Sequence, residues 1–80
     1  MAARKEIHRE THRSIGTMYG RAYGKAKYGG GVGYLLPGRQ EAAGLALRHF
    51  GTDPKSMEAR EFVQGFIQEV ERLQYKWANK

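Results

Sequence analysis

The chain has 80 residues and no cysteine, so it has room for one small domain and cannot form a disulfide or a thiolate metal site. Its formal net charge at pH 7 is +6, from 14 basic and 8 acidic side chains, and such an excess favours partners that carry negative groups. No apolar run reaches the roughly 18 residues of a membrane span, and no signal-peptide core follows the first basic residues, so we expect a cytoplasmic protein without a membrane segment.

The positive charge is concentrated in the first third of the chain. Residues 1–28 hold seven basic and two acidic side chains, a net of +5, whereas residues 29–53 sum to zero and residues 54–80 to +1. Charge gathered in one segment attracts phosphate groups or an acidic protein face. A solvated basic surface that only keeps the protein soluble is the alternative.

The first predicted helix spans about residues 3–27. Its apolar residues follow one narrow face at helical spacing, at Ile7, Ile15, Met18, Ala22 and Ala26. Three glycines within the helix lower its intrinsic propensity by about 1 kcal/mol each, so it needs support from other parts of the protein. We expect the Ile–Met–Ala face to pack on the other helices or on a second copy of the chain.

A row of glycines recurs at every fourth position of this helix, at Gly16, Gly20 and Gly24. Small residues at that spacing let another backbone approach closely, as in small-xxx-small helix pairs. We therefore assign these three glycines to helix packing, either within the chain or in a homo-oligomer.

Four of the five tyrosines lie between residues 19 and 34, interleaved with basic residues. Aromatic rings stack on nucleic-acid bases at about 1–3 kcal/mol per base, and neighbouring cations bind phosphates. The pattern indicates a nucleic-acid surface made of Arg9, Arg13, Tyr19, Arg21, Tyr23, Lys25, Lys27 and Tyr28. Ordinary packing of the tyrosines is the alternative. Nothing in the pattern reads base edges, so the expected binding is non-specific.

Residues 29–33 include four glycines and are expected to form a flexible joint without regular structure. A second helix is predicted over residues 39–50, with Gly51 placed for a left-handed stop at its C-terminus. The link from this helix to the next is short, so we expect residues 38–80 to form the core as a helical hairpin.

The third helix is predicted over residues 54–78, with Asp53 as its cap and Pro54 at its first position. Its apolar stripe includes Phe62, Phe66, Val70, Leu73 and Trp77. Its four glutamates, Glu58, Glu61, Glu69 and Glu71, are assigned to the solvated polar side of the helix. Gly65 also falls on that side, where only a close approach by another backbone would explain it.

Patterns for catalysis and metal binding are weak. His8 and His12 share a helix face, but Arg9 stands where zinc proteases carry glutamate, and no third ligand is indicated. Ser14 and Ser56 lack the neighbours that activate a nucleophile, and no glutamate is predicted in an apolar pocket. We therefore expect no enzymatic activity, no metal and no cofactor.

Together these patterns predict an all-α fold of three helices in a single domain, residues 1–80, with a basic N-terminal helix over residues 1–28. They favour a small non-catalytic binding protein that contacts nucleic acid through its N-terminal third. The alternative is an inhibitor or adaptor that docks on an acidic face of a larger complex. Because a chain this short builds a thin core, we also expect a homo-oligomer or a subunit of a complex.

Overall fold

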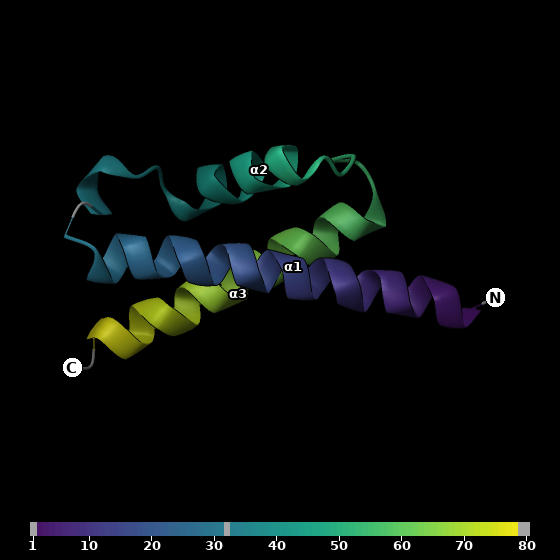
Figure 1. Ribbon diagram of the computed structural model, residues 1–80, viewed down its shortest axis with the longest axis horizontal. Helices are drawn as coiled ribbons and strands as arrows, with labels where there is room; N and C mark the ends of the chain where they lie inside the picture. The colour runs from purple at the N-terminus through teal and green to yellow at the C-terminus, as the bar shows by residue number, and fades with distance from the viewer. Residues whose placement is uncertain (1, 32, 79–80) are drawn as a thin grey trace.

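The computed structural model describes the backbone of residues 2–31 and 33–78 and the side chains of residues 11–31 and 33–78. This part of the chain forms three helices and one short 3-10 turn, α1 (Ala2–Gly29), η1 (Gly33–Leu35), α2 (Arg39–Phe50) and α3 (Met57–Ala78), and it contains no strand (Figure 1). The predicted all-α fold of three helices is confirmed. None of the described helices is long and apolar enough to cross a membrane.

Helices α1 and α3 lie against each other and run in the same direction, while α2 runs back in the opposite direction beside them (Figure 1). The parallel sense also follows from the contacts, because Gly16 meets Phe62 and Gly24 meets Leu73. The pairing of α1 with α3 is the most extensive between any two helices. The buried hydrophobic side chains described all lie between residues 42 and 73, in α2 and α3, and α1 packs its glycines and partly buried tyrosines against them.

The glycine row of α1 lies on α3, with Gly16 and Gly20 against its backbone and Gly24 against the side chain of Leu73. A β-carbon built on Gly16 would lie 2.0 Å from the carbonyl oxygen of Phe62, and one built on Gly20 would lie 2.6 Å from that of Phe66. The contact is reciprocal, because a β-carbon on Gly65 of α3 would lie 2.3 Å from the carbonyl oxygen of Arg13. Any side chain at these positions would force the two helices apart. The same contact explains why residue 65 of α3 is a glycine.

This contact corrects the orientation predicted for the first helix. Only part of the expected Ile–Met–Ala face lies on the other helices: Ile15 packs against the core, whereas Met18 is 66% exposed and Ala22 is also exposed. The hydrophobic pattern gave the wrong face because glycines carry no apolar side chain, although they allow the closest packing.

The core lies where the three helices meet. Phe62, Phe66 and Val70 of α3 are fully buried, and Ala43 and Leu47 of α2 cover them from one side. Complete burial of such a side chain stabilises the fold by about 1.5–3 kcal/mol. A few large side chains on α3 therefore hold this thin core together.

Helix α2 has the predicted bounds, and Gly51 ends it with a left-handed φ of 89°. Helix α3 begins at Met57, three residues later than predicted, because residues 53–56 form a turn in which the Ser56 amide donates to the Asp53 carbonyl. The Ser56 hydroxyl then accepts a hydrogen bond of 3.2 Å from the amide of Ala59. The N-cap of α3 is therefore Ser56 and not Asp53. Serine and aspartate are both common at that position.

The glycine-rich joint is more regular than expected. Gly29 still belongs to α1, and Gly33 begins the 3-10 turn, where a β-carbon would lie 1.9 Å from the Lys27 carbonyl oxygen. The Tyr23 hydroxyl donates to the Pro37 carbonyl, which ties the segment after the turn to α1. The prediction of a joint without regular structure is wrong at both ends, because these glycines permit a tight reversal. Val32 lies outside the described residues.

Two alanine substitutions test the backbone contact. Gly16→Ala should lower the free energy of unfolding by about 1–3 kcal/mol, because the new methyl group meets the α3 backbone. Gly44→Ala is the matched control, since Gly44 is also inside a helix but has nothing within 4 Å of its β-carbon position. That change should raise the stability by about 0.5–1 kcal/mol through helix propensity. Chemical denaturation followed by circular dichroism measures both, and equal effects would contradict the contact.

Candidate functional site

The tyrosines assigned to base stacking lie between the helices. The ring of Tyr19 packs on Phe62 with centroids 5.5 Å apart, and the ring of Tyr23 packs on Phe66 at 5.6 Å. Tyr28 is half-buried against the same core. Burial is the main cause that raises the pKa of Tyr23, whose hydroxyl is used within the chain. Ordinary packing accounts for all three rings.

Two histidines take part in aromatic contacts. His12 packs edge-on against the ring of Phe50, with centroids 5.7 Å apart. Nδ1 of His49 is 3.1 Å from the Tyr19 hydroxyl. His8, considered with His12 as a metal ligand, lies outside the described side chains.

The predicted cations of the first third have different surroundings. Arg13 is held by α3, because Nη2 of its guanidinium group lies 2.6 Å from the Glu61 carboxylate. The Lys27 ammonium donates to the carbonyl of Leu36 at 3.2 Å. Lys25 is exposed and makes no ion pair or hydrogen bond to any described residue. Arg9 lies outside the described side chains.

Arg21 belongs to a cluster that the sequence did not predict, centred on Glu69 of α3. Glu69 is only 5% exposed. Its Oε2 oxygen accepts a hydrogen bond of 2.8 Å from Nε of Arg21, and its Oε1 oxygen accepts one of 2.5 Å from Nε of Arg72. A single buried carboxylate therefore holds two guanidinium groups that come from two different helices.

The assignment of Glu69 to the solvated side of α3 is wrong. Residues 62, 66, 69 and 73 follow one another at spacings of three and four, so Glu69 continues the inward-facing row of Phe62, Phe66 and Leu73. That spacing could have predicted from the sequence that Glu69 faces inward. The negative charge of Glu69 instead favoured the prediction that it lies in solvent. A buried carboxylate is tolerated here because both of its oxygens are hydrogen-bonded to cations.

The two arginines keep Glu69 ionised. The hydrogen bond from Arg72, together with the weaker effect of the bond from Arg21, lowers the pKa of Glu69 from its usual value, and burial opposes this change only in part. The carboxylate is therefore negative near neutral pH and stays in place as the anchor of both guanidinium groups.

Around this anchor the second halves of α1 and α3 form a surface that we call the basic ridge, made of Arg21, Lys25, Arg72 and Lys76. The side chains of Arg21 and Arg72 are 51% and 57% exposed, although Glu69 holds them at one end. Lys25 and Lys76 are exposed and follow these arginines by one turn. Because the helices are parallel, both lysines lie on the same side of the cluster.

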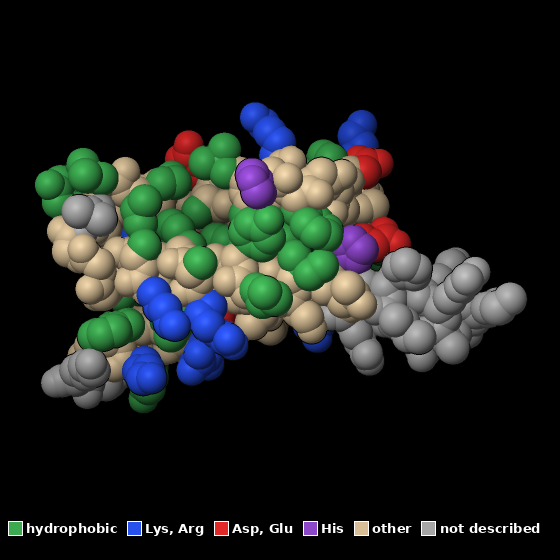
Figure 2. Space-filling model, in the orientation of Figure 1, with side chains coloured by type: hydrophobic (Ala, Val, Ile, Leu, Met, Phe, Trp, Pro, Cys, Tyr) green, Lys and Arg blue, Asp and Glu red, His purple; other side chains and the backbone are tan. Residues whose placement is uncertain are grey.

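Figure 2 shows several Lys and Arg side chains close together at the lower left, over these parts of α1 and α3, and others apart from them at the upper edge. With Arg21 and Arg72 bound to Glu69, and Lys25 and Lys76 one turn further along the two helices, the four cations and one carboxylate give the ridge a net charge of +3. Because the ridge brings cations of two helices together around one buried carboxylate, we take it as the candidate functional site.

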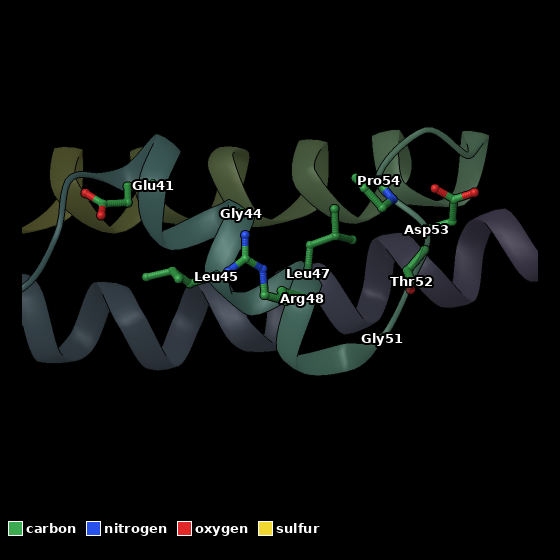
Figure 3. A pocket seen from close by; sticks show the side chains of 9 residues that line it. All are labelled: Glu41, Gly44, Leu45, Leu47, Arg48, Gly51, Thr52, Asp53 and Pro54. Atoms are coloured by element: carbon green, nitrogen blue, oxygen red, sulfur yellow. The ribbon is translucent and has the colours of Figure 1, made fainter.

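A hollow lies elsewhere, between the outer side of α2 and the loop that follows it (Figure 3). It has a volume of about 800 Å³ and is lined by Leu45, Arg48 and Pro54, among others. Its charged residues are exposed, and the Asp53 carboxylate accepts a hydrogen bond from the amide of Lys55. Ligand sites usually bring buried polar groups together in a closed pocket, and this open hollow does not.

Comparisons with protein-family models, with curated proteins and with solved structures find no match to this chain. A function can therefore be inferred only from the residues of the protein and their geometry, above all from the basic ridge.

The Glu69 cluster predicts how stability depends on pH. A carboxyl group whose pKa is lowered by folding stabilises the protein above its unfolded pKa of about 4.3, and that contribution is lost as the pH falls through the lower folded value. Glu69→Gln should therefore cost about 1 kcal/mol at pH 7, since the partner arginines are half-exposed. The difference from the unchanged protein should shrink towards pH 3.

Thermal or chemical unfolding at several pH values measures this difference. Glu71→Gln is the control, because the Glu71 carboxylate is exposed and lies 3.9 Å from Arg39. It should change stability little at any pH. A cost for Glu69→Gln that is the same at pH 3 and pH 7 would argue against the cluster.

Proposed function

We propose that this protein is a small non-catalytic binding protein that holds the phosphate backbone of nucleic acid on the basic ridge. The observation that supports the proposal most is the pair Arg21 and Arg72, fixed by one buried carboxylate and half-open to solvent. The planar guanidinium group matches the geometry of phosphate oxygens better than a lysine ammonium does. Lys25 and Lys76 extend the positive charge along both helices.

The proposed surface differs from the one expected from the sequence. It keeps Arg21 and Lys25 but adds two cations of α3, and it gives no role to the tyrosines, whose rings pack in the core. Contacts between cations and phosphates fix position without reading bases. Binding should therefore be non-specific, with dissociation constants of about 10⁻⁴–10⁻⁶ M at physiological salt.

A binding role also suits the chemistry of the ridge better than a catalytic one. Both oxygens of Glu69 already accept hydrogen bonds. Its lowered pKa makes the carboxylate a poor proton acceptor near neutral pH. The acid closest to the cations therefore acts as a structural anchor and is badly suited to be a general base.

An acidic protein surface is the second candidate partner, and one observation favours it. Met18 is 66% exposed beside Arg21, and both line a shallow hollow with Arg13 and Thr17. Methionine and arginine are enriched at protein interfaces. Self-association, which the sequence also led us to expect, would need a surface other than the glycine row, since that row is used within the chain.

The salt dependence of binding tests the nucleic-acid proposal. Contacts of the four cations with three or four phosphates predict slopes of log K against log salt of about −2.1 to −2.8 on single strands and about −2.7 to −3.6 on duplex DNA. Changing Lys25 and Lys76 together to alanine should weaken binding and flatten these slopes by about 1.4 and 1.8. Fluorescence anisotropy with labelled oligonucleotides provides the measurement.

The matched control changes Arg48 and Arg60 together to alanine, which removes the same charge from exposed positions outside the ridge. It should leave the slopes nearly unchanged. Equal losses from both double variants would show that net charge, and not the ridge, carries the binding. If no oligonucleotide binds at about 50 mM salt and tens of micromolar protein, the nucleic-acid proposal fails. The acidic protein partner would then be the better candidate, and Met18→Ala should weaken its binding.

A further inference from the structure

We infer that Arg21 and Arg72 bind a single phosphate group together, as a clamp. Glu69 is the positioning residue that keeps both guanidinium groups in place. This inference rests on the proposed function and assigns its central contact. Lys25 and Lys76 would then contribute attraction along the ridge, while the paired guanidinium groups form the directed hydrogen bonds.

The atoms that make the contacts support this arrangement. In both arginines the nitrogen nearest to Glu69 is Nε, at 2.8 Å for Arg21 and 2.5 Å for Arg72. In a planar guanidinium group the edge formed by Nη1 and Nη2 lies opposite Nε, so a contact through Nε leaves that edge for a ligand. The exposure of both side chains, 51% and 57%, agrees with an outer edge open to solvent.

The shared carboxylate sets the spacing of the two groups. Arg21 binds Oε2 and Arg72 binds Oε1 of the same side chain, so the two guanidinium groups are held side by side despite their equal charge. An arginine that is free in solution has rotamer entropy to lose on binding. Because Glu69 orders both side chains beforehand, less of that entropy is lost when a ligand arrives.

A phosphate group is a suitable ligand for two adjacent guanidinium groups, each of which can donate two parallel hydrogen bonds. It carries negative charge and several acceptor oxygens around one centre, and arginine binds it through two parallel hydrogen bonds. An internal phosphodiester of a nucleic-acid strand and a terminal phosphomonoester share this chemistry, and the monoester carries about −1.5 to −2 charge at pH 7. The clamp is therefore a site for one phosphate, from either source.

The decisive experiment measures whether Glu69→Gln raises or lowers the affinity of the protein for an oligonucleotide. This change removes a negative charge and raises the net charge of the ridge from +3 to +4. If the ridge binds through charge alone, affinity at about 50 mM salt must rise. If the clamp is correct, affinity should fall by about fivefold or more, because both arginines lose their anchor.

Glu71→Gln is the matched control for charge, because it makes the same change at an exposed residue beside Arg39. It should raise affinity by no more than about twofold. Circular dichroism and thermal unfolding establish that each variant is folded at the temperature of the binding assay. A rise in affinity for Glu69→Gln that equals or exceeds that for Glu71→Gln overturns the clamp.

Variants that keep the charge test the clamp without touching the buried residue. Arg21→Lys and Arg72→Lys preserve the charge but remove the planar fork, and each should weaken binding about fivefold to tenfold. The double variant should be only slightly weaker than either single one, since two forks that act on one phosphate are lost together. Losses below about twofold for each single variant would contradict the clamp even if Glu69→Gln is unstable.

The source of the phosphate is read from two probes, a single-stranded oligonucleotide with a 5′-phosphate and the same strand without it. An equal loss on both probes for Arg21→Lys assigns the clamp to an internal phosphodiester. A larger loss on the phosphorylated strand assigns it to the terminal group. If the unchanged protein binds neither strand, the proposed function itself fails. If the unchanged protein binds and the arginine variants bind equally well, only the clamp fails.

Discussion

Direct contact between the backbones of α1 and α3 determines how the other parts of this structure are placed. At Gly16, Gly20 and Gly65 a single added carbon would collide with a carbonyl group of the facing helix. Helices that approach this closely fix each other's position along their axes, because carbonyl groups and α-carbons interlock without flexible side chains between them. The rings of Tyr19 and Tyr23 then fill the angle between α1 and the other two helices.

The same register creates the candidate site. Arg13 pairs with Glu61 and Arg21 pairs with Glu69, and in both pairs the partners are 48 positions apart in the sequence. Two ion pairs with one common offset are what two parallel helices in fixed register produce. The second pair is the buried one, and Arg72 joins it from the next turn of α3. Packing of glycines on one side of α1 thereby places two guanidinium groups together on the adjacent side.

The sequence predicted those features whose signals are local. Gly51 and the apolar residues before it were enough to give the bounds of α2, and the spacing from Phe62 to Leu73 was enough to find the buried stripe of α3. For α1 the hydrophobic pattern pointed to a different face, whereas the spacing of Gly16, Gly20 and Gly24, which we assigned to helix packing, marks the side that meets α3. Glu69 was placed in solvent because the sequence does not show that a cation 48 positions away would reach it. The role of Arg72 and Lys76 in the ridge was missed for the same reason.

Close packing of α1 on α3 is the central claim, and nuclear Overhauser effects between backbone protons test it most directly. Isotope-labelled protein should give cross-peaks between the α-protons of Gly16 and the backbone of Phe62, between Gly20 and Phe66, and between Gly65 and Arg13. Only backbones in contact bring these protons together. Spectra that lack all three cross-peaks, and instead connect Met18 and Ala22 to the rings of α3, would contradict the packing and the basic ridge that depends on it.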